Sequence, residues 1–221
     1  MTAAEFKAYF LAEYDAATSL SAPGWEDSEI SSFLNIAQDS IVTELFKSGD
    51  LSKLAELVTT VYFGATSLHP SIDNGVWVDL VDITAKPNYF YYLNGKASIS
   101  RTNPIVTNKW VPFELIDRIN ASKFFKTPFN KPWFKYPKIF IDTFDSLDQN
   151  TNVGTRFIIL VDGYTSTNIA SIEITYLQRP DRISITNNTT TNLNESLHQT
   201  IVALAVEQAV KSIKIAKISN Q

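Results

Sequence analysis

The sequence predicts an α+β fold in which helices from both ends of the chain form one helical bundle, with a β-rich unit, antiparallel or mixed, inserted between them. Two stretches have the apolar spacing of long helices: residues 25–46, WEDSEISSFLNIAQDSIVTELF, and the closing stretch from Asn194 to Ser219. The sequence between them is rich in β-branched and aromatic residues and in turn signals. We therefore expect a bundle made of residues 1–65 and 194–221, and a β-rich unit made of residues 66–193.

Composition narrows the class of protein before any motif is considered. The chain has 221 residues, of which 44% are hydrophobic, enough to bury a core in one large domain or two small ones. Its net charge of -4 and its pI near 5.2 argue against a general nucleic-acid binder, which needs a basic surface. Without cysteine it can form neither a disulfide nor a thiolate metal site. Its first residues lack the pattern of a secretory signal, and no apolar run reaches the roughly 20 residues that span a bilayer, so we expect no membrane contact.

The N-terminal region is predicted to contain three helices. Thr2 and Glu5 match a capping box, which begins a short first helix. The second helix, residues 25–46, has acidic residues in its first turn, where the helix dipole favours them, and ends at Gly49. A third helix is predicted from Asp50 to Gly64. The aromatic face of the first helix comprises Phe6, Tyr9, Phe10 and Tyr14.

The middle of the chain carries the signals of strands and turns. Asn94-Gly95 between two short β-forming runs predicts a hairpin, because a type I′ turn needs positive φ at both central residues. Pro112–Ile119 is predicted to be a short helix with proline near its first turn. The predicted strands are Val76–Ile83, Tyr89–Leu93, Ala97–Ser100, Ile139–Phe144, Arg156–Val161 and Ile169–Leu177.

The closing helix has a wider apolar face than a single neighbouring bundle is expected to cover. A polar linker, Thr186–Asn194, leads into it, and apolar residues then occupy more than the roughly 100° stripe of a surface helix. Either the β-rich unit covers the excess or another subunit does, and we favour another subunit. The lysines in its last turns suit the negative end of the dipole and are candidates to contact a partner. The predicted interface with another subunit or partner comprises Val202, Val206, Lys211, Ile213, Lys214, Ile215 and Lys217.

The most unusual loop is residues 123–137, which contains FFKTPFNKPWFKYP. Its three prolines forbid regular secondary structure, and its aromatic residues alternate with lysines. One interpretation is an arm that contacts a partner, and the other is a long connection folded over its own core. The predicted partner-contact residues are Phe129, Trp133, Phe134 and Tyr136.

The sequence offers no constellation for catalysis. It contains no P-loop, no G-x-S-x-G and no H-E-x-x-H motif. The two histidines, His69 and His198, lie far apart in the sequence without a third ligand pattern, and the aspartates at 142, 145 and 148 do not have the spacing of an EF-hand loop. We therefore expect no catalytic residues, no metal site and no cofactor, and we interpret the protein as not being an enzyme.

Two stretches at the ends of the chain carry a family resemblance. The run YDAATSLSAPGWEDSEISSFLNIAQDSIVTELF resembles the N-terminal part of structural ring proteins of crAss-like bacteriophages. The run RPDRISITNNTTTNLNESLHQTIVALAVEQAV is similar to the C-terminal part of head-to-tail adaptor proteins of tailed phages. In those adaptors a polar linker leads into a helix that opens with Leu-His and continues with Ile-Val and alanines. The matching positions here are Leu197, His198, Ile201, Val202 and Ala205.

The resemblance implies a subunit of a homo-oligomeric ring beneath the portal, in the neck that joins head and tail. Such a ring, twelvefold to match a portal, extends the channel through which DNA passes as cargo and docks other neck or tail proteins. It implies a location in the virion, with assembly in the host cytoplasm. The acidic balance agrees with a conduit that must not hold its DNA. The alternative hypothesis is a non-catalytic glycan- or ligand-binding module of a tail or cell surface, which the aromatic loop favours.

Overall fold

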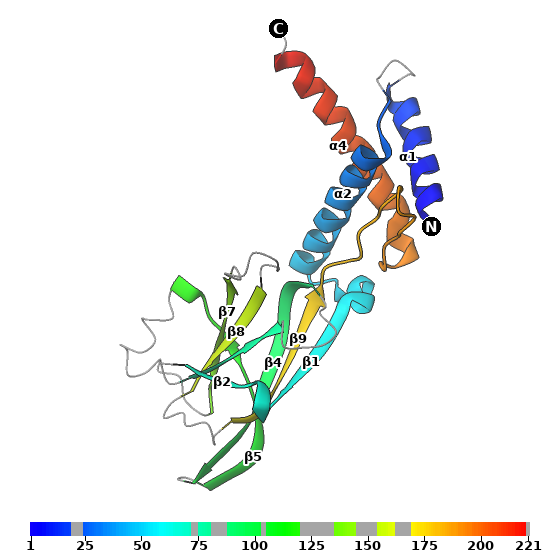
Figure 1. Cartoon of the computed structure of the whole chain (residues 1–221). Coiled ribbons are helices and arrows are strands. Elements are labelled where there is room, and N and C mark those ends of the chain that lie inside the picture. Colours follow the sequence, from blue (N-terminus) through cyan, green and yellow to red (C-terminus); the bar gives the residue numbers. More distant parts are fainter. Residues whose placement is uncertain are drawn as a thin grey trace. The chain divides into compact units, whose positions relative to one another are not determined.

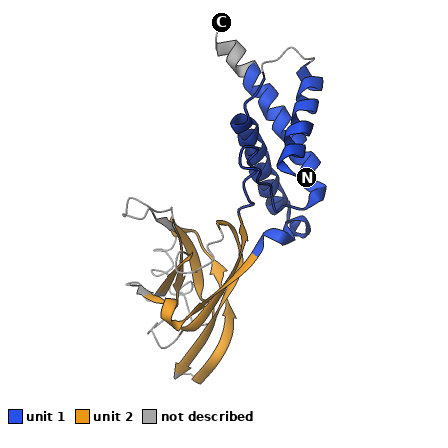
Figure 2. Ribbon diagram, turned by 45° about the vertical axis from the view of Figure 1, so that its right-hand side comes forward, with its two compact units in different colours: residues 1–58, 179–221 blue, residues 59–178 orange. Residues whose placement is uncertain are grey.

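The computed structural model describes residues 1–18, 24–71, 75–80, 88–102, 105–119, 135–144, 154–161 and 169–219, although not every side chain within them. The chain divides into two compact units (Figure 2). The helical unit comprises Met1–Val58 and Arg179–Gln221, and the sandwich unit comprises Thr59–Gln178. The first boundary, after Val58, lies seven residues before the predicted one at 65. The second, after Gln178, lies fifteen residues before the predicted one at 193. The α+β class with helices at both ends of the chain is confirmed.

The helices begin and end at the signals that the sequence carries. The capping box is present at the first helix, where the backbone N–H of Thr2 donates to the Glu5 carboxylate and that of Glu5 donates to the Thr2 hydroxyl. Gly49 ends the second helix in the left-handed region, with φ 79°, which glycine adopts without steric cost. The helices of this unit are α1 (Ala3–Thr18), α2 (Asp27–Ser48), the 3₁₀ turns η1 (Leu51–Leu57) and η4 (Glu195–Leu197), and α4 (His198–Ser219).

The prediction of a third helix from Asp50 to Gly64 is wrong. Only η1 is helical, and the chain then enters strand β1 (Val58–Gly64). The run VTTVYFG is dense in β-branched and aromatic residues, which favour a strand over a helix. Because β1 belongs to a sheet, the helical unit ends earlier than predicted.

The core of the helical unit lies where α1 and α2 pack against α4 (Figure 1). Phe6, Phe10 and Tyr14 of α1 are buried, and the Phe10 ring stacks on Tyr14 and on Phe33 of α2. Tyr9, which the prediction placed on the same aromatic face, is exposed instead. Helices from the two ends of the chain thus share one core.

Residues 179–193 are folded against α2. The Asn35 side chain donates to the carbonyl of Ile183 and accepts from its backbone N–H, while the Gln38 amide donates to the carbonyl of Asp181. Ile183 and Leu193 are buried. The predicted polar linker, Thr186–Asn194, follows these bonds; it is itself partly packed, since Thr191 and Leu193 are buried and the Thr190 hydroxyl donates to the Met1 carbonyl, which the sequence prediction missed.

The sandwich unit contains two sheets that share one hydrophobic core. All strand pairs with a described register are antiparallel except β6 with β7, which are parallel, so the β-rich unit is mixed. In the first sheet the order is β1, β9 (Ile169–Gln178), β4 (Tyr89–Thr102) and β5 (Ile105–Pro112). In the second it is β2 (His69–Ser71), β3 (Gly75–Asp79), β8 (Gly154–Leu160), β7 (Lys138–Phe144) and β6 (Glu114–Leu115).

Two local predictions in this unit are wrong. Asn94-Gly95 is no turn: β4 continues through it, with a register shift between Tyr92 and Asn94 against β9. Glycine is needed there for space, because a Cβ on Gly95 would lie 2.9 Å from Cδ2 of Phe113. Pro112–Ile119 is mostly extended, since Pro112 ends β5 and β6 follows. The strands predicted near β7, β8 and β9 are confirmed; of Val76–Ile83, β3 covers the first part and residues 81–83 lie outside the described residues.

Candidate functional site

From Ile201 to Ala209, most of the apolar face of α4 is covered within its own chain. Val202 and Val206 are only 1% and 6% exposed, because α1 and α2 both pack on α4. Their prediction as an exposed subunit or portal interface is therefore wrong. The sequence shows the width of an apolar face, but it does not show that two helices converge on it.

Ala209 is the last buried residue among the side chains of α4 that the structure describes. Beyond it, Val210 and Ile213 are half-buried and Lys211 is exposed, with its ammonium 2.6 Å from the Glu207 carboxylate. The other predicted interface residues, Lys214, Ile215 and Lys217, lie within α4, but their side chains are outside the described part of the structure.

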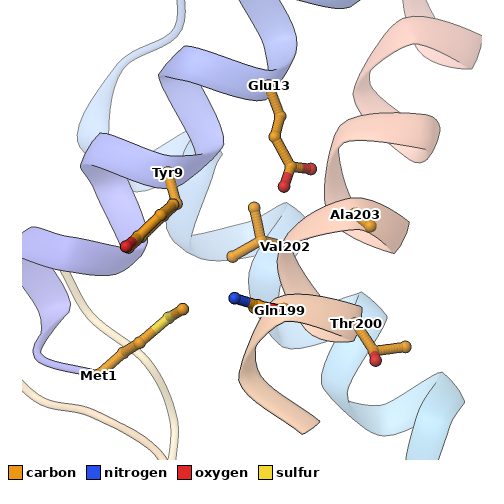
Figure 3. Close-up of a pocket in the computed structure, with 7 residues that line it drawn as sticks. All are labelled: Met1, Tyr9, Glu13, Gln199, Thr200, Val202 and Ala203. Carbon is orange, nitrogen blue, oxygen red and sulfur yellow. The ribbon is translucent and has the colours of Figure 1, made fainter. Parts of the chain in front are cut away.

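A groove of about 470 Å³ lies between α1 and the first turns of α4 (Figure 3). Tyr9 and Glu13 of α1 line one side, and Glu13 extends its carboxylate toward α4. Gln199 and Ala203 of α4 line the other side, with Val202 at the base. Tyr9 is 48% exposed, a large fraction for an aromatic residue. The groove thus combines an exposed ring with a carboxylate.

A second hollow of about 470 Å³ shares Met1, Tyr9 and Gln199 with the groove and continues it. It adds two carboxylates, Glu5 and Glu195. The hydrogen bond that Glu5 accepts from the Thr2 backbone lowers the pKa of Glu5, so this carboxylate stays ionised. We call the two hollows together the acidic groove.

His198 lies beneath the acidic groove, at the start of α4. Its Nε2–H donates to the carbonyl of Leu193, 3.1 Å away, so Nδ1 is free to accept a hydrogen bond from the Met1 ammonium at 2.9 Å. The ring is 4% exposed and lies 5.2 Å from the Phe6 ring. Burial lowers the pKa of His198, which is therefore neutral at pH 7. His198 thus attaches the start of α4 to the N-terminus and to Phe6 of α1.

Of the predicted partner-contact residues, only Tyr136 lies within the described part of the chain; Phe129, Trp133 and Phe134 do not. Tyr136 is 64% exposed and lines a cleft of about 320 Å³ with Lys109, Trp110 and Pro112 of β5. The Lys96 ammonium lies 5.1 Å from the centroid of the Trp110 ring. The sequence prediction missed Trp110, because a single tryptophan in a strand-forming run gives no sign of exposure.

The described residues form no metal centre: no three His, Cys, Asp or Glu side chains among them are placed so that they could hold a metal ion together. His69 stacks on Trp77 in the sandwich unit, and His198 is engaged in the helical unit. Asp142 pairs with Arg118, while residues 145 and 148 lie outside the described ranges. No helix in the described part of the chain is long and apolar enough to cross a bilayer.

The sequence prediction also missed a stack on the second sheet. The Trp77 ring lies between the His69 ring, 4.0 Å away, and the Arg156 guanidinium, 3.8 Å away. Arg156 in turn donates two hydrogen bonds to Asp79. These residues meet because β2, β3 and β8 are neighbours in the sheet, which only the strand order reveals.

Comparison with known proteins gives no family: no protein-family model matches the chain, and no curated protein matches it significantly.

Proposed function

We propose that the chain is a non-enzymatic structural subunit of a ring in the portal–tail neck of a tailed bacteriophage. The ring extends the DNA channel and offers other neck or tail proteins a docking surface. The proposal places the protein in the virion, after assembly in the host cytoplasm, with the portal protein and further copies of itself as partners.

The observation that carries the proposal is the helical unit made from both ends of the chain. α1 and α2 pack against α4, while the 120 residues of Thr59–Gln178 form a separate sandwich between them in the sequence. The resemblance to phage ring and adaptor proteins rests on these same two ends and implies that they share one bundle. The buried Leu197 and His198 lie at the start of α4, where the resemblance matches them.

The test is assembly with the portal protein encoded in the same genome. The purified chain is mixed with portal rings, and complexes are imaged by electron microscopy and measured by native mass spectrometry. We expect a ring of this chain stacked on the portal, with twelve copies. A chain that stays monomeric with and without portal would contradict the proposal.

The cleft between Trp110 and Tyr136 favours the second candidate function, a glycan- or ligand-binding module. Exposed aromatic rings beside lysines offer stacking and hydrogen bonding to a sugar. A glycan array probed with the wild type and with Trp110→Ala tests it. Glycan binding that Trp110→Ala abolishes would support this function, and an array without signal would leave the ring function as the better explanation.

A further inference from the structure

Charge is distributed unevenly along the helical unit. Outside residues 211–221, this unit carries 13 acidic and five basic side chains. Residues 211–221, KSIKIAKISNQ, carry three lysines and no acidic residue. The unit is therefore acidic apart from the end of α4, which is basic.

The acidic groove is the place where this negative charge meets a hollow. It brings Glu5, Glu13 and Glu195 around the exposed ring of Tyr9. No described basic residue pairs with Glu13 or Glu195. The groove thus offers unpaired carboxylates next to an apolar surface, a combination that fits a basic helix with isoleucines.

The basic end of α4 has this composition, but it cannot reach the groove of its own chain. Ala203 lines the groove, and a helix rises about 16 Å over the eleven residues from Ala203 to Lys214. The α4 side of the groove and the basic end also lie on one continuous helix, so no hinge in α4 can bring them together. The complementary surfaces can meet only between two copies of the chain.

We propose that residues 211–217 of α4 in one copy bind in the acidic groove of the next copy. Lys214 and Lys217 of this segment pair with the groove carboxylates, while Lys211 keeps its bond to Glu207, and the isoleucines cover the ring of Tyr9. The two surfaces differ, so the contact is head-to-tail. Each copy contributes its basic end to one neighbour and its acidic groove to the other, as a closed ring requires. This inference deepens the proposed ring function and rests on it, since it names the contact between ring subunits.

Because the chain contains no cysteine, a disulfide between copies of it can form only at cysteines introduced by mutation. Two full-length variants, Glu13→Cys and Lys214→Cys, are mixed in equal amounts and mildly oxidised, alone and with portal. We expect a covalent dimer of the two different variants to dominate over dimers of either variant alone. Mixing excludes a bond within one chain, because each chain has a single cysteine.

The matched control is Glu44→Cys, which replaces another exposed glutamate, on α2 and away from the groove. Mixed with Lys214→Cys, it should give little cross-linking. Equal cross-linking of Glu13→Cys and Glu44→Cys to Lys214→Cys, or none in either mixture, would overturn the proposed contact.

A charge exchange tests the same contact without cross-links. Glu13→Lys should weaken assembly about tenfold, because it places like charges together. The Lys214→Glu and Lys217→Glu double variant should weaken assembly as well, and combining all three changes should restore it. Glu44→Lys is the control of equal charge change and should have no effect. Failure of the combined variant to recover would count against the pairing.

The two experiments separate this contact from the ring function. If the charge variants assemble into rings on portal as well as the wild type does, the proposed contact is refuted but the neck function is not. The expected cross-link in a chain that never assembles on portal would support the contact and refute the neck function.

Discussion

Gly95 shows at the scale of one residue how a turn signal can have another cause. The sequence pairs it with Asn94 as a hairpin, yet its conformation is that of a continuous strand. What makes glycine necessary is the close approach of the Phe113 ring, the Glu173 carbonyl and the Tyr92 hydroxyl. A glycine in a strand thus marks crowding as readily as a turn.

Gly95→Ala is expected to destabilise the sandwich unit by about 1–3 kcal/mol, because the new Cβ must displace neighbouring atoms. Chemical denaturation followed by tryptophan fluorescence measures the change. Gly64→Ala is the matched control: it belongs to the same unit, has φ -77°, and a Cβ there has no atom within 4 Å. An equal loss in both variants would contradict the steric explanation.

His198 is expected to make the helical unit less stable in acid. Its pKa is lowered in the folded state by burial, so the unfolded chain binds the proton more readily and stability is lost as the pH falls below about 6.5. Thermal unfolding between pH 7.5 and pH 5.5 measures this loss.

The variant His198→Gln should lose part of this pH dependence, because it cannot titrate. The control is His69→Gln, which removes the chain's other histidine, in the sandwich unit, and should keep the pH dependence. If the stability of His198→Gln falls with pH as steeply as that of the wild type, the loss of stability in acid comes from other groups.

At the scale of an element, α4 shows how one helix can have two different roles along its length. Most of its apolar residues up to Ala209 belong to the core of the helical unit, whereas Val210 and Ile213, the apolar residues described beyond it, are only partly buried. The structure therefore changes the expected effect of substitutions at Val206, which the sequence assigned to an assembly surface.

Val206→Asp is expected to unfold the helical unit rather than only prevent assembly. It places a charge at a position that is 6% exposed, which costs roughly 3 kcal/mol or more. Circular dichroism and thermal unfolding of the full chain provide the measurement. The control is Ala203→Asp, which introduces an aspartate at an exposed position of α4 and should leave the fold intact.

The segment of residues 179–193 gives a second prediction at this scale. Asn35→Ala removes two hydrogen bonds to the backbone of Ile183, leaves its N–H and carbonyl without these partners, and should cost about 1–3 kcal/mol. Urea unfolding measures the loss. Ser40→Ala, also on α2, removes only an exposed bond to the Ile36 carbonyl and should have little effect. Similar losses in the two variants would refute this role for Asn35.

At the scale of the whole molecule, the chain contains two compact units with separate buried cores. The sandwich core is formed by residues of both sheets, and none of these belongs to the helical unit. We therefore expect the isolated segment Thr59–Gln178 to fold. Dispersed amide resonances and a cooperative thermal transition would support this; an unfolded spectrum would show that the sandwich depends on the helices.

The sequence determined the local features of this protein. Capping residues, helical spacing and β-forming runs predicted α1, α2, α4 and the strands from β7 to β9, because these signals act over a few neighbouring residues. It did not determine whether Val58–Gly64 forms a helix or a strand. This segment becomes β1 because it pairs with β9 in the first sheet.

The candidate site was decided by tertiary structure alone. The acidic groove joins Glu13 to Ala203, which are 190 positions apart in the sequence, because α1 and α4 pack together. The sequence carried the charges of the groove and of the basic end of α4. Only packing shows which apolar side chains of α4 are already covered and which carboxylates surround a hollow, because burial depends on neighbours that are distant in the chain.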